Sequence, residues 1–120
     1  MALTQQEKEL YVAFIESVYQ GAVPVSVSNI SPEVANIVNQ MLTEIIKCSK
    51  GMAVTHAVYS AFYGNVPATI PSVLKQLGKA GVNTLKSWIK TALSDKRYKS
   101  CISSVALTWR SPLQMALMGI

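Results

Sequence analysis

Apolar side chains that recur at intervals of three and four residues run through most of this 120-residue chain, and they constrain its fold more than any other feature. Such intervals place side chains on one face of an α-helix, where a core can cover them. The longest run begins at Val34 and ends at Ile46. Only residues 22–30 alternate apolar and polar side chains as a strand does, and no second stretch offers a partner strand. The sequence therefore predicts an all-α fold.

The length of the chain suits one compact core and not two. We predict a single helical domain over residues 1–120, with an N-terminal helix and arm over residues 1–31 and a helical core with an apolar C-terminal tail over residues 32–120. The core is expected to be helix-turn-helix-like, and the arm to be extended near residues 21–31. Half of the residues are apolar and 14% are charged, which excludes a disordered chain. This apolar content is high for a small protein, so we expect part of the surface to be covered by neighbouring copies.

Capping signals mark where the first helices begin. Thr4 and Glu7 form a capping box that predicts a helix to about Gln20. Residues 31–33, Ser-Pro-Glu, predict the start of a second helix, because Ser caps, Pro fits the first position and an acid complements the dipole. Residues 52–63 are nearly apolar all round, which predicts a buried third helix.

The later part of the chain is divided by proline and glycine. Residues 65–71 carry two prolines and predict a loop, after which residues 72–94 predict a helical segment that its two glycines kink. Asp95 begins a last long helix. We expect Ser111 and Pro112 to interrupt that helix and leave an apolar tail.

The charges are divided unevenly along the chain. Up to Glu44 there are five glutamates and one lysine, a balance of −4, whereas from Ile45 onward eight lysines and two arginines stand against Asp95 alone, a balance of +9. This asymmetry indicates either a polyanion partner for the later part or head-to-tail pairing of acidic and basic regions between subunits.

A row of lysines is the most informative local pattern. At about 100° per residue, the four lysines of residues 72–94 fall within an arc of roughly 60° on one side of a continuous helix, beside a side of small residues. Such a row can follow phosphates, although a solvated face over a buried stripe has the same pattern. Further cations stand at the next helix start, where they oppose the helix dipole. The candidate phosphate contacts are Lys75, Lys79, Lys86, Lys90, Lys96, Arg97 and Lys99, with Lys47, Lys50 and Arg110 as weaker candidates.

The same segment has a competing interpretation as a membrane-surface helix, because residues 78–93 carry lysines on one face and Leu, Trp and Ile on another. No run of about 18 apolar residues occurs, and the N-terminus lacks the layout of a signal peptide, so we expect neither a spanning helix nor export. We expect the tyrosines and tryptophans to serve as core and interface anchors rather than as base-stacking platforms.

Catalytic and metal-binding patterns are absent from the sequence. Cys48 and Cys101 match no metal-ligand spacing, and we interpret them as buried free thiols, since a disulfide requires an oxidising compartment or a hyperthermophile. His56, the single histidine, is expected to be a packed or capping side chain. No phosphate loop occurs and the carboxylates are scattered, so we predict no enzyme and no cofactor.

Four segments in order, NIVNQMLT (36–43), AVYSAFYG (57–64), GKAGVNTLKSWIKTAL (78–93) and VALTWRSP (105–112), resemble the major coat proteins of rod-shaped and filamentous archaeal viruses. The resemblance covers roughly residues 36–112. It implies a helical virion subunit that pairs with itself or a paralogue, clamps double-stranded DNA in A-form and stacks into a helical filament, present in the host cytoplasm before assembly and, in the virion, with or without a membrane envelope. It also implies DNA contact by the N-terminal arm, from which the acidic first helix departs.

Two functions therefore stand against each other. The first is a structural coat subunit that binds double-stranded DNA without sequence specificity. The second is a membrane-active or host-factor-binding small helical protein.

Overall fold

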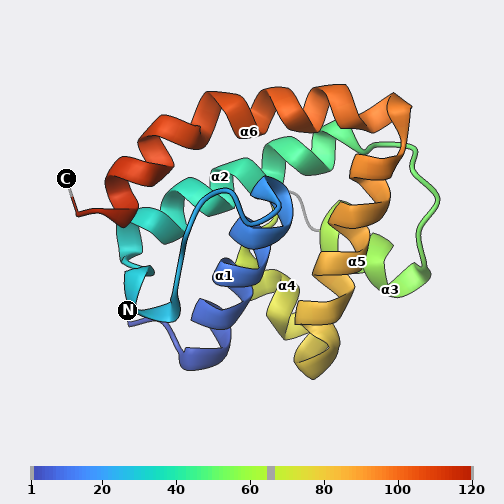
Figure 1. Cartoon of the computed structure of the whole chain (residues 1–120). Coiled ribbons are helices and arrows are strands. Elements are labelled where there is room, and N and C mark those ends of the chain that lie inside the picture. Colours follow the sequence, from blue (N-terminus) through green and yellow to red (C-terminus); the bar gives the residue numbers. More distant parts are fainter. Residues whose placement is uncertain (1, 65–66, 120) are drawn as a thin grey trace.

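The computed structural model describes residues 2–64 and 67–119, and throughout these residues the chain is all-α, as predicted (Figure 1). Three of the elements are single turns: the 3-10 turns η1 and η3 and the π-helical turn η2. The helices are α1 (Gln5–Tyr19), α2 (Pro32–Cys48), α3 (His56–Val58), α4 (Ile70–Leu77), α5 (Gly81–Ser94) and α6 (Lys96–Leu117), and the turns are η1 (Val27–Asn29), η2 (Tyr59–Tyr63) and η3 (Gly78–Ala80).

Helix α1 lies at the centre of the molecule. The predicted capping box is present: the Thr4 amide donates to Glu7 Oε1 at 2.8 Å, and the Glu7 amide donates to Thr4 Oγ1 at 3.1 Å. Apolar residues of α1 such as Phe14 and Ile15 are fully buried, and the helix packs on α2, α4, α5 and α6. The N-terminal helix is therefore part of the same core as the rest of the chain.

Helices α2 and α6 lie along one another and form one side of the fold (Figure 1). Ser31 caps α2 as predicted, accepting a hydrogen bond from the amide of Val34 at 3.2 Å. A disulfide joins Cys48, at the end of α2, to Cys101 on α6, with a Cα–Cα distance of 5.6 Å. The interpretation of these cysteines as free thiols is therefore wrong, because the packing of two helices far apart in sequence brings them together.

Two long-range hydrogen bonds hold α6 to the rest of the fold. The Tyr19 hydroxyl of α1 donates to the Ala106 carbonyl at 2.7 Å. The Trp109 indole nitrogen donates to the Glu44 carboxylate of α2 at 2.8 Å. Together with the disulfide they anchor α6 near its first turns and along its middle.

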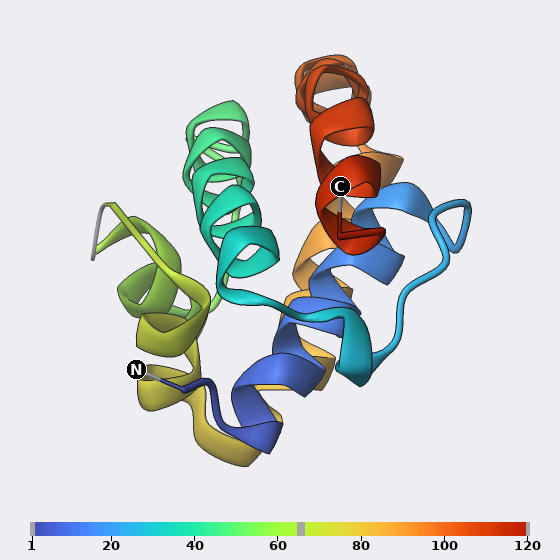
Figure 2. The same ribbon diagram turned by 90° about the vertical axis from the view of Figure 1, so that its left-hand side faces the viewer.

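Residues 21–31 do not form an extended arm. Figure 2 shows that they curl beside α1 and under the C-terminal end of α6, and their middle forms the turn η1. The apolar side chains Val23 and Ile30 are buried, with exposed fractions of 1% and 5%. Burial of these two side chains against the core makes a packed loop more stable than an arm that projects into solvent.

The third predicted helix is shorter than expected. Residues 52–55 are not helical, and Thr55 caps α3 by accepting from the Val58 amide at 3.3 Å. The helix passes directly into the π-helical turn η2, which closes with a hydrogen bond from the Gly64 amide to the Tyr59 carbonyl at 2.9 Å. Phe62 is fully buried and stacks on Trp88 with ring centres 4.2 Å apart, so burial is confirmed for part of this segment.

Residues 72–94 are two helices and not one kinked helix. Helix α4 starts at Ile70, two residues before the prediction, because Thr69 caps it and Pro71 fits its first turn. Gly78 then adopts φ +60°, a conformation that ends the helix and that residues other than glycine rarely adopt. Helices α4 and α5, joined by η3, are the helix–turn–helix pair of the fold. Residues 65–66 of the predicted loop lie outside the described residues.

Helix α6 continues through Pro112 to Leu117, so the predicted interruption is wrong. The proline costs one backbone hydrogen bond. Beyond it, Leu113 and Ala116 are buried beneath the helix, with exposed fractions of 0% and 5%. Their packing holds the last turns of α6 on the fold. The expected apolar tail is therefore the end of α6 and the turn of residues 118–119, and Ile120 lies outside the described residues.

Candidate nucleic-acid interface

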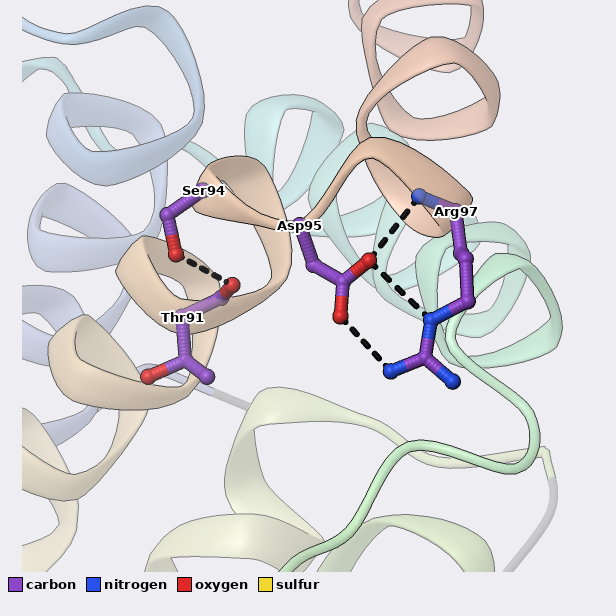
Figure 3. A network of polar contacts seen from close by, with 4 residues as sticks. All are labelled: Thr91, Ser94, Asp95 and Arg97. Atoms are coloured by element: carbon purple, nitrogen blue, oxygen red, sulfur yellow. Dashed lines mark hydrogen bonds and ion pairs between the residues drawn. The ribbon is translucent and has the colours of Figure 1, made fainter.

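Positive charge dominates the surface of the segment that runs from Ile70 to Leu117. These residues contain six lysines and two arginines, and their single acid is Asp95. Asp95 has a structural role, because it caps α6 by accepting a hydrogen bond from the Arg97 amide at 2.9 Å (Figure 3). The other acids lie on α1 and α2, and no carboxylate stands on α4, α5 or α6 themselves.

Arg97 differs from the other candidate contacts. Its guanidinium forms an ion pair with Asp95, with Nη2 2.8 Å from Oδ2 (Figure 3). The same guanidinium lies 5.1 Å from the ring centre of Tyr98. The hydrogen bonds from Arg97 lower the pKa of the Asp95 carboxyl. This pairing gives Arg97 a structural role at the start of α6, and it is the single ion pair among residues 2–64 and 67–119.

The lysine row of residues 72–94 is divided by the break at Gly78. Lys75 lies on α4 and Lys79 on η3, so the common arc calculated for a continuous helix does not exist. Lys86 and Lys90 do lie one turn apart on α5, and all four side chains are exposed. The structure therefore supports a common face for two of the four lysines.

The outer face of α6 is a longer cationic surface, whose residues the sequence analysis named as candidates without placing them on one face. At 100° per residue Lys96, Lys99 and Arg110 fall within an arc of about 60°, and all three are exposed. Small Ser100 and Ser103 lie on the same face. At 1.5 Å per residue this 22-residue helix is about 33 Å long. The signal was present in the sequence as residues 96–110, which are predicted to be helical and contain no acid.

Arg110 also affects a buried group beneath α6. Burial raises the pKa of the Tyr19 hydroxyl to about 12, and the nearby charge of Arg110 acts in the opposite direction. Arg110 is thus placed at the middle of α6, near the end of α1.

Lys47 and Lys50 lie at the end of α2 and in the turn after it, and both are exposed. The disulfide of Cys48 brings this end of α2 to α6 at Cys101, one turn beyond Arg97. The fold therefore gathers cations from two distant parts of the sequence around the end of the molecule where α6 begins (Figure 1).

The small-residue side predicted for α5 borders a groove. Thr84, Ser87 and Thr91 line it, and the opposite wall is formed by residues 52–55. The groove has a volume of about 660 Å³ and lies beside the lysine face of α5. Hydroxyl groups in such a groove can donate hydrogen bonds to phosphate or sugar oxygens.

The apolar side of α5 that suggested a membrane-surface helix is inside the protein. Leu85 and Ile89 have an exposed fraction of 0% and Trp88 of 4%. Among the described residues, no helix combines the length and apolar character needed to cross a membrane. A membrane contact through α5 would require the core to open.

Among the described residues, no group of three or more His, Cys, Asp or Glu side chains lies close enough together to hold a metal ion. His56 was expected to be packed or to cap a helix. It is exposed at the first position of α3, and the residue that caps this helix is Thr55. The chain was compared with family models, with curated proteins and with solved structures, and no match was found.

Proposed function

We propose that the chain is a structural coat subunit of a virion that binds double-stranded DNA through its phosphates and assembles with further copies into a filament. The observation that carries this proposal is the charge of residues 70–117, where eight cations stand against one acid and that acid is a helix cap. Cations that face no carboxylate on their own helices are available to neutralise phosphates. The proposed contacts are to phosphates and not to the edges of bases, so binding would depend on the charge and shape of the duplex and not on its sequence.

The outer face of α6 has the dimensions that such contact needs. From Lys96 to Arg110 its cations extend over about 21 Å at 1.5 Å per residue, while phosphates follow one another at about 3.4 Å along one DNA strand. The small Ser100 and Ser103 between the cations allow a sugar-phosphate backbone to approach closely. Lys86 and Lys90 are two further exposed cations, on the helix that directly precedes α6.

Assembly is supported by two surface features. Leu107, Met115 and Met118 are exposed on α6 and just after it, with exposed fractions of 76%, 48% and 68%, so a neighbouring copy packed on α6 would remove apolar surface from water. Glu9 and Glu16 are exposed two turns apart on one face of α1. An acidic face on one copy complements the positive surface of another.

The disulfide is compatible with an archaeal setting. Disulfides are rare inside most cells, but intracellular proteins of hyperthermophilic archaea are rich in them. The Cys48–Cys101 bond therefore raises no conflict with a subunit that accumulates in the host cytoplasm before assembly.

Binding of random-sequence duplex DNA as a function of salt tests this proposal. The parent should lose affinity steeply with salt, and the Lys96→Gln/Lys99→Gln/Arg110→Gln variant should have a shallower logarithmic slope by about 0.9 for each lost phosphate contact. Negative-stain microscopy of the same samples reports filaments, and circular dichroism of the bound duplex reports its form.

A matched control removes acids instead of cations. The Glu9→Gln/Glu16→Gln variant should leave the salt slope of DNA binding unchanged, while it weakens association between copies. Equal slopes for the parent and the triple variant on α6 would refute the assignment of this face, and an affinity independent of salt would refute DNA binding through phosphates.

A further inference from the structure

A pocket opens at the end of α2, outside the outer face of α6. It has a volume of about 560 Å³ and is bounded by the end of α2, the turn that follows and the π-helical turn η2. The residues that carry its chemistry are Lys47, Lys50, Met52, Tyr59 and Tyr63. No carboxylate lines it.

Tyr63 forms a fixed wall of this pocket. Its hydroxyl lies 2.6 Å from Ser49 Oγ and donates to the Ser49 carbonyl at 3.1 Å. The indole nitrogen of the buried Trp88 donates to the Tyr63 hydroxyl oxygen at 3.2 Å. Three polar contacts hold one end of the ring, so its orientation is set by the fold before any ligand arrives.

Tyr59 stacks on this fixed ring and is open to solvent. The two ring centres are 5.7 Å apart with an angle of 29° between the planes, and Tyr59 has an exposed fraction of 56%. For Tyr59 the prediction of a core or interface anchor does not hold within the subunit. The π-helical turn brings these two aromatic residues to one place, and such turns are frequent at functional sites.

The charges beside the rings have the sign that a phosphate requires. Lys47 stands in the last turn of α2 and Lys50 in the turn that follows, and both are exposed. An exposed aromatic ring beside two ammonium groups matches a ligand that joins a flat ring to a phosphate. A base stacks on an aromatic side chain through its π-face, whatever its sequence identity.

We propose that this pocket binds one unpaired nucleotide, with its base on Tyr59 and its phosphate near Lys47 and Lys50. The source is either a free nucleoside monophosphate or a nucleotide at the end or in a single-stranded stretch of a DNA strand. This site goes beyond the proposed binding of duplex DNA and does not depend on it, because the bases of an intact duplex are stacked on one another and unavailable to Tyr59.

Calorimetry at one fixed salt concentration tests the pocket with thymidine 5′-monophosphate, thymidine, inorganic phosphate and a short oligothymidylate. Thymidine 5′-monophosphate should bind the parent more tightly than either thymidine or phosphate. The Tyr59→Leu variant should bind it roughly 5- to 150-fold more weakly, the range expected for loss of one stacked base. The Tyr59→Phe variant keeps the ring and should bind as the parent does.

Two lysine pairs separate the phosphate contact from general electrostatic attraction. The Lys47→Gln/Lys50→Gln variant should weaken the monophosphate and leave thymidine unchanged, whereas Lys86→Gln/Lys90→Gln should bind both as the parent does. Tighter binding of the oligothymidylate than of the monophosphate assigns the site to a DNA strand, and the reverse order assigns it to a free nucleotide.

The proposal is overturned if neither the monophosphate nor the oligothymidylate binds, if Tyr59→Leu binds them as the parent does, or if inorganic phosphate binds as tightly as the monophosphate. All variants change exposed side chains, and circular dichroism verifies that each is folded. Failure of the nucleotide proposal would not refute the proposed binding of duplex DNA. Duplex binding is tested separately, by the salt slopes of variants on α6.

Discussion

Removal of the Cys48–Cys101 disulfide should cost the fold about 4 kcal/mol. The bond closes a loop over a sequence separation of 53 residues, and loop-closure entropy for that length gives this value at 25 °C. The perturbation is the Cys48→Ser/Cys101→Ser variant. Because Cys101 is exposed and Cys48 is only partly buried, the loss of two sulfur atoms from the core adds little to the entropic cost.

Urea unfolding followed by circular dichroism measures this cost. For a small protein the free energy of unfolding falls by about 1–3 kcal/mol per molar urea, so the midpoint should fall by more than about 1 M. The slope should rise at the same time, because the denatured chain without its cross-link exposes more surface. The parent protein treated with a reductant is the matched control, since it loses the bond and keeps both sulfur atoms.

Coincident unfolding curves for the parent and the double serine variant would refute this reasoning. They would mean that the end of α2 and α6 are held together equally well without the covalent bond. A loss that appears in the serine variant and not in the reduced parent would assign the effect to side-chain packing and not to the cross-link.

Three further changes test individual contacts. The pKa of Tyr11, like that of Tyr19, is raised by burial to about 12, so each hydroxyl contributes stability that is complete below about pH 10 and is lost as the pH rises towards 12. The Tyr19→Phe variant should lose less stability over that range in alkaline thermal melts. Asn39→Ala should cost about 1–3 kcal/mol in urea unfolding, because Asn39 Oδ1 accepts from the Tyr11 hydroxyl at 3.1 Å and from the Ile70 amide at 2.9 Å. Pro112→Ala should raise the melting temperature, because alanine restores the backbone donor that proline lacks inside α6.

Local signals predicted the helix starts well. Thr4 and Ser31 cap α1 and α2 as expected, since a capping residue acts on amides two or three positions away and needs no tertiary partner. The end of α1 at Tyr19 also lies close to the predicted end at about Gln20. These features depend on neighbours in the sequence, which is why the sequence alone reveals them.

Features that depend on contacts between distant segments were not predictable in the same way. The sequence spacing of Cys48 and Cys101 carries no sign that α2 and α6 run side by side. Pro112 lies inside a helix because buried side chains beyond it outweigh its missing hydrogen bond. Gly78 was expected to kink a helix, and its positive φ instead ends one.

The same distinction applies to the candidate interface. The lysine row depended on one unbroken helix from residue 72 to 94, so the break at Gly78 removed Lys75 and Lys79 from it. The face of α6 required no such assumption, because Lys96, Lys99 and Arg110 belong to one predicted helix. The arc of Lys96, Lys99 and Arg110 could be calculated from the sequence. Comparing the faces of all predicted helices would have identified it as the longest cationic face.

Stability and proposed function are carried by opposite sides of α6. The inner side holds the helix to the fold through buried Ile102 and Leu113, and the disulfide and the bond from Tyr19 lie along it. On the outer side Lys96, Lys99 and Arg110 are exposed, and substitutions at such positions should shift stability by no more than about 0.5 kcal/mol. A loss of DNA affinity after changes at Lys96, Lys99 and Arg110 therefore cannot be ascribed to unfolding, which makes this face the place where the proposed function can be tested without disturbing the fold.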